Sequence, residues 1–109
     1  MEATSIHETL VEMATILHRH GQTGHAEHIA RLAEEANPHT FADEIVSLTI
    51  WGGSGSVVDA TFNDNADDRS FNELVVNLAQ ALDELGFATP RTRWVGQTIE
   101  DWLNTHPTI

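Results

Sequence analysis

Apolar residues recur every three or four positions over most of this 109-residue chain, which is the spacing of one face of an α-helix. The spacing predicts five helices, over residues 5–20, 24–36, 40–51, 70–85 and 90–104. The clearest pattern is that of 70–85, where one face carries Phe71, Leu74, Val75, Leu78, Leu82 and Leu85. The short connection between the first two predicted helices favours an antiparallel pair.

Capping residues set the expected helix boundaries. Ser-x-x-Glu sequences begin at Ser5 and Ser70 and match the capping box, and Thr23 stands where an N-cap is expected. We expect three glycines to end helices in the left-handed conformation: Gly21, Gly52 and Gly86.

The helical pattern breaks at the centre of the chain, in Trp51-Gly52-Gly53-Ser54-Gly55. After this cluster Val58, Ala60 and Phe62 alternate with other residues, as in a short strand. The cluster lacks the Gly-Lys-Ser/Thr ending of a phosphate loop, so we interpret it as a tight turn. The predicted fold is mainly α: a single helical domain over residues 1–109, with about five helices in a compact bundle and one short extended segment or strand after a central glycine turn.

Charge is the strongest compositional signal. The formal net charge is −12, five arginines are the only fixed cations, and there is no lysine. Such a surface repels nucleic-acid phosphates and attracts a basic protein. No apolar run is long enough to span a membrane, and the N-terminus has acidic residues (Glu2 and Glu8) where a signal peptide has basic ones. We therefore expect a cytoplasmic protein that binds neither nucleic acid nor membranes.

Histidines are the main candidates for chemistry. His18, His20, His25 and His28 cluster around the first predicted helical turn, and imidazoles brought together can hold zinc or nickel. The alternative is a set of solvated histidines at helix ends. The chain has no cysteine nucleophile, and Ser54 does not fit a nucleophile elbow because a helix precedes it. We expect no enzymatic activity, cofactor or catalytic residue.

The central stretch resembles a group of small uncharacterised bacterial proteins that carry the motif Gly-Gly-Met-Gly-Ser-x-x-Asp before an amphipathic helix. The residues that match are Gly52, Gly53, Gly55, Ser56 and Asp59. The resemblance covers roughly residues 26–85, and Ser54 replaces the methionine of the motif. Proteins of this kind look like immunity proteins, so the resemblance implies a chain that neutralises a toxin.

Charge and resemblance together predict a non-enzymatic binding protein that neutralises a cognate, basic bacterial toxin. The expected partner-binding residues are Trp51, Asp59, Asp64, Asp67, Asp68, Glu34 and Glu35. Trp94 is a second candidate anchor, and Trp102 is expected in the core. Two alternatives stay open: a metal protein using the histidines, and a structural or adaptor homo-oligomer joined through Val58 and Phe62.

Overall fold

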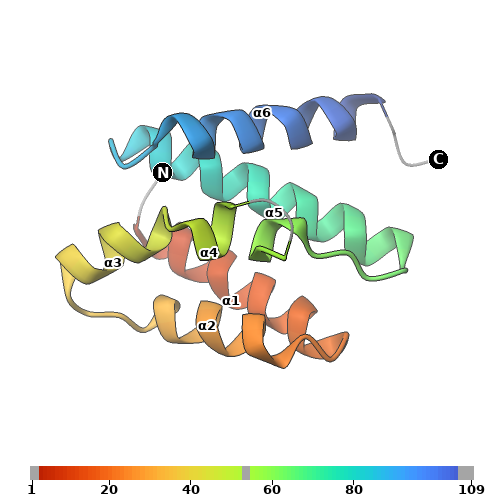
Figure 1. Cartoon of the computed structure of the whole chain (residues 1–109), viewed down its shortest axis with the longest axis horizontal. Helices are drawn as coiled ribbons and strands as arrows, with labels where there is room; N and C mark the ends of the chain where they lie inside the picture. Colours follow the sequence, from red (N-terminus) through yellow and green to blue (C-terminus); the bar gives the residue numbers. More distant parts are fainter. Residues whose placement is uncertain (1–2, 53–54, 106–109) are drawn as a thin grey trace.

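A computed structural model describes residues 3–52 and 55–105. Over these residues the chain forms five helices of eight residues or more, one shorter helix and no strand (Figure 1). The helices are α1 (Ala3–Arg19), α2 (Thr23–Ala33), α3 (Pro38–Ile45), α4 (Leu48–Trp51), α5 (Asn65–Glu84) and α6 (Pro90–Thr105), and η1 (Val57–Asp59) is a 3-10 turn. The prediction of a mainly α bundle of about five helices is confirmed.

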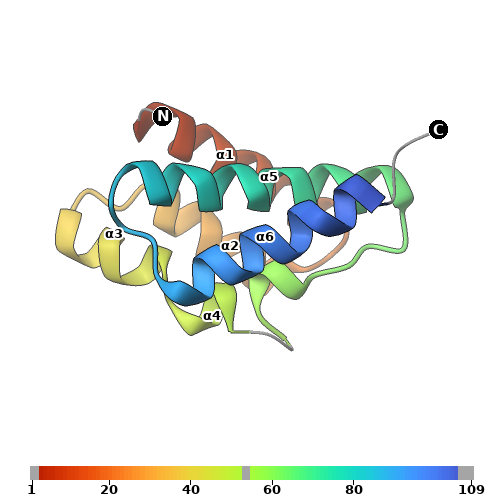
Figure 2. The ribbon, with the colours of Figure 1, turned by 90° about the horizontal axis from the view of Figure 1, so that it is seen from above.

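Two glycine turns reverse the chain as the sequence predicts. Gly21 has φ 77° and Gly86 has φ 79°, the left-handed region that a glycine enters without steric cost. The amide after each glycine closes the preceding helix: Gln22 donates to Leu17 over 2.9 Å, and Phe87 donates to Leu82 over 2.9 Å. These turns place α2 against α1 and α6 against α5, and α5 also contacts α1 (Figures 1 and 2).

The helix starts differ from the predicted capping boxes. α5 begins at Asn65 because the Asp64 carboxylate accepts from the amide of Asp67 over 3.0 Å, so Ser70 lies inside the helix. α1 begins at Ala3, which places Ser5 within it, and the N-cap of α2 is Gln22 instead of Thr23. The predicted start of α5 was five residues late because the Asp64 cap was overlooked.

The helix predicted over residues 40–51 is two helices. The break at Val46 and Ser47 rotates the second piece, so that Ile50 is buried while Leu48 is 68% exposed. Gly52 has φ −80°, which is not the predicted left-handed conformation. A glycine is needed there for a different reason: a Cβ atom would collide with the carbonyl of Leu48.

The segment after the central turn is not a strand over the residues that the structure describes. Val57–Asp59 is a 3-10 turn, and the apolar residues Val57, Val58 and Phe62 point into the core. Phe62 meets Phe71 of α5 edge-on, with ring centroids 5.1 Å apart. The apolar alternation therefore reflects burial without strand pairing. Gly53 and Ser54, on which part of the glycine motif rests, lie outside the described residues.

The core lies between the α1–α2 pair and the α5–α6 pair, and α4 closes it from the side. Its largest side chain is Trp51, which is fully buried. None of the described helices combines the length and the apolar character needed to cross a membrane.

Candidate functional site

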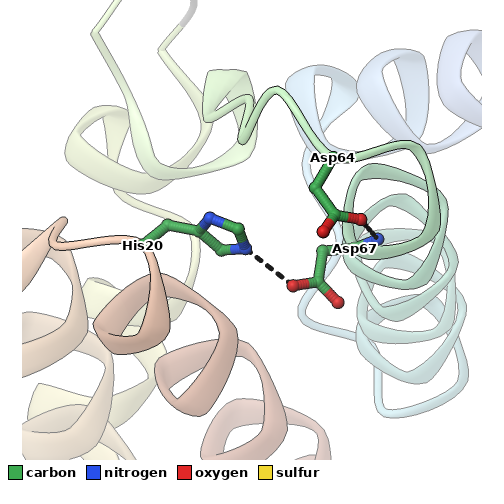
Figure 3. A group of neighbouring side chains, drawn as sticks. All are labelled: His20, Asp64 and Asp67. Atoms are coloured by element: carbon green, nitrogen blue, oxygen red, sulfur yellow. Dashed lines mark hydrogen bonds and ion pairs between the residues drawn. The ribbon is translucent and has the colours of Figure 1, made fainter.

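One histidine and two aspartates converge where the end of α1 meets the start of α5 (Figure 3). His20 follows α1, Asp64 is the N-cap of α5, and Asp67 lies in the first turn of α5. One nitrogen or oxygen atom from each lies within 4.8 Å of the others. Among the described residues this is the only group of three or more metal-ligating side chains so close together.

Asp67 holds this cluster together. The Nη1 atom of Arg19 lies 2.9 Å from each carboxylate oxygen, and Nε2 of His20 lies 2.6 Å from Oδ2. The hydrogen bond from His20, followed by that from Arg19, lowers the pKa of Asp67 below its ordinary value and outweighs the opposing effect of desolvation. Asp67 is therefore ionised near neutral pH, and it ties α1 to α5 across 47 positions of sequence.

Asp64 and the neighbouring Asp68 accept hydrogen bonds from backbone amides. Asp64 caps the amide of Asp67, and Asp68 Oδ1 accepts from the amide of Phe62 over 2.7 Å. Negative charge in the first turn of a helix is also favoured by the helix dipole. The three aspartates thus fix how the central segment enters α5.

An open hollow lies beside the cluster, lined by His20, Gln22, Thr61, Phe62, Asn63 and Asp68. The His20 ring packs on Phe62 with centroids 4.8 Å apart, and the Gln22 side chain donates to the carbonyl of Thr61 over 3.1 Å. The hollow is therefore lined mainly by polar residues, together with Phe62.

The side chains of this cluster pair their charges with one another. An imidazole and two carboxylates are acceptable ligands for zinc and similar ions. A cation bound there, however, would compete with Arg19 for Asp67 and would face the positive end of the α5 dipole. The ionised state of Asp67 also disfavours a role as a general acid.

The six predicted carboxylates fall into two groups. Asp59, Asp64, Asp67 and Asp68 belong to the central segment and the start of α5. Glu34 and Glu35 follow the C-terminal end of α2, at the opposite end of the α1–α2 pair from His20 (Figure 1). Asp59 is exposed and accepts from the amide of Gly55 over 3.3 Å.

Trp51 is not available to a partner. Its ring is fully buried, and its Nε1 donates to the carbonyl of Ile45 over 2.7 Å. The expectation of a surface anchor is wrong because the break between α3 and α4 turns this side chain inward. The exposed tryptophans are on α6: Trp94 is 63% exposed, and Trp102, which was expected in the core, is 42% exposed.

The predicted cluster of four histidines does not form among the described residues. His28 instead lies 3.3 Å from Glu44 of α3, and His18 is exposed. The sequence analysis missed the contact of Arg19 and His20 with Asp67, because no local pattern links positions so far apart. It could have found the cap itself, since Asp64 stands three positions before Asp67.

Comparison of the chain with models of protein families, with curated proteins and with solved structures finds no match.

Proposed function

We propose that this chain is a non-enzymatic binding protein that captures a basic protein, in the manner of an immunity protein that neutralises a toxin. The observation that carries the proposal is its charge: the formal net charge is −12. Three of the five arginines already pair with carboxylates of the chain itself, namely Arg19 with Asp67, Arg69 with Glu73 and Arg93 with Asp83. The excess negative charge is left to attract a cationic partner and to speed its association.

Asp59 and Asp64 are the strongest candidates for the contact. Both are exposed, and one oxygen of each accepts from a backbone amide of the chain. A carboxylate has further acceptor positions, so each can still receive a hydrogen bond from a lysine or arginine. The backbone contacts hold both side chains in place beforehand, which reduces the entropy lost on binding.

Asp67 and Asp68 contribute mainly through their charge in this proposal. Asp67 is occupied by Arg19 and His20, and Asp68 by the amide of Phe62.

Glu34 and Glu35 form a second acidic patch away from the first. The resemblance of the glycine motif to that of immunity-like bacterial proteins supports the same function, which we place in the cytoplasm.

The test uses the product of the gene next to that of this chain as the probe, because toxins and their inhibitors are usually encoded together. Its affinity is measured by isothermal titration for the wild type and for two variants. Asp59→Asn/Asp64→Asn removes two charges but keeps both amide acceptors, and Glu34→Gln/Glu35→Gln removes two charges at the other patch. We expect the first pair to weaken binding about tenfold or more, and the second pair by less. An affinity that Asp59→Asn/Asp64→Asn leaves unchanged would remove these two aspartates from the interface, and absence of binding would remove the adjacent product as partner.

A second candidate function is the binding of a divalent transition metal by His20, Asp64 and Asp67. The proximity of their ligand atoms, within 4.8 Å, favours it. Titration of tag-free protein with zinc separates this function from the first. A metal protein would bind one zinc per chain, and His20→Gln would abolish that binding while His18→Gln would not. Failure of the wild type to bind zinc would exclude a zinc site.

A further inference from the structure

The outer face of α6 carries an ordered set of exposed residues. Arg91, Trp94, Thr98, Asp101 and Trp102 follow one another at spacings that place them on one side of a helix, and all five are exposed. The two tryptophans are large side chains that keep 63% and 42% of their surface exposed. Exposed aromatic residues on one face of a helix are typical of an interface.

The opposite face of α6 already has a partner. Val95, Gly96 and Leu103 are buried, and Gly96 approaches Ala79 so closely that an added Cβ would lie 2.7 Å from the Ala79 methyl group. Figure 1 shows α6 at the top edge of the molecule, next to α5. Trp94 and Trp102 keep 63% and 42% of their surface outside this packing.

The two ends of this face carry opposite charges, so the face is complementary to an antiparallel copy of itself. Arg91 lies in the first turn of α6, and Asp101 lies near its end. In an antiparallel pair with a two-fold axis beside Thr98, Trp94 of one copy faces Trp102 of the other. Arg91 then lies about one turn, or ~5 Å, from Asp101 of the other copy, which an arginine side chain can span. A two-fold axis repeats each of these contacts.

From this pattern we propose that α6 pairs in antiparallel fashion with α6 of a second copy of the chain. A basic partner is less well matched to this face, because α6 contains two arginines and two carboxylates and so has no net formal charge. The inference is independent of the proposed function, which uses the acidic central segment.

The contact is expected to be weak. A tryptophan buries about 150–250 Å² when fully covered, and only 63% of Trp94 and 42% of Trp102 are still exposed, so the four side chains supply at most about 300–500 Å². Stable interfaces bury about 1,200 Å² or more. Two copies that each carry a net charge of −12 also repel one another. The pair should therefore be a transient dimer that forms more readily as salt screens this repulsion.

Sedimentation equilibrium of the full chain tests the proposal, at protein concentrations from about 10 μM to about 1 mM in 0.15 M salt, where charges more than about 8 Å apart are screened. The average mass of the wild type should rise towards that of a dimer. Trp94→Ala should weaken association about tenfold or more. Val11→Ala, which changes a 44% exposed apolar residue of α1, should leave it unaltered.

Charge reversal identifies the antiparallel arrangement. Arg91→Glu and Asp101→Arg should each weaken the dimer, and the double variant Arg91→Glu/Asp101→Arg should restore it. All these positions are exposed, and circular dichroism checks that each variant is folded. A wild type that stays monomeric throughout would overturn the proposal, and so would association that Trp94→Ala does not affect. If Trp94→Ala instead weakens binding of the adjacent gene product by a monomeric chain, this face belongs to that partner and self-pairing is overturned.

Discussion

The indole of Trp51 is fully buried, and its Nε1 donates to the carbonyl of Ile45 over 2.7 Å. Trp51→Phe removes this donor and part of the ring, so we expect it to lower the free energy of unfolding by about 1–3 kcal/mol. Urea denaturation measures the change. Trp94→Phe alters an exposed ring and should cost less than about 0.5 kcal/mol. Equal costs would place Trp51 outside the core.

Asp67 should give the protein a specific sensitivity to acid. The pKa of Asp67 is lowered from its ordinary value of 3.8 by His20 and Arg19. Its contribution to stability is therefore complete above pH 3.8 and is lost as the pH falls through the lower, folded-state value. In denaturant titrations at decreasing pH, Asp67→Asn should be less stable than the wild type near neutrality, and the difference should shrink in acid. A difference that is constant with pH would contradict this origin.

At the scale of the helices, periodicity was sufficient to predict which segments are helical. The apolar stripe of α5 and the glycine turns at Gly21 and Gly86 are local features, and local features are visible in a sequence. The division of residues 40–51 into α3 and α4 is different, because the spacing of apolar residues continues through it. Burial of Ile50 and Trp51 against the rest of the chain decides that break.

The approach of α5 to α6 depends on Gly96. Ordinarily a change from glycine to alanine inside a helix stabilises it by about 1 kcal/mol. Here the new methyl group would lie 2.7 Å from the Ala79 Cβ, so the two helices would have to separate. We expect Gly96→Ala to lower stability by about 1–2 kcal/mol in thermal or urea unfolding.

Gly24 is the matched control for this change. It also lies in a helix, α2, but an added Cβ there meets nothing within 4 Å. Gly24→Ala should leave stability unchanged or raise it by up to about 1 kcal/mol. If Gly96→Ala were as well tolerated, the close packing of α5 on α6 would be refuted.

For the whole molecule, the sequence revealed the sum of the charges but not their arrangement. The net charge of −12 can be counted directly. The contact of Asp67 with Arg19 and His20, the inward turn of Trp51 and the outward face of α6 all depend on how the helices pack. These arrangements redefine the candidate interface: exposed aspartates of the central segment replace the buried tryptophan.

The most direct test of the central claim, that surplus negative charge serves to bind a basic protein, is a titration of the adjacent gene product with the wild-type chain at two salt concentrations. At about 50 mM salt we expect a stoichiometric complex whose affinity falls about tenfold or more at about 300 mM, because salt screens the attraction between exposed charges. Binding that does not change with salt, or no binding at either concentration, would contradict the claim.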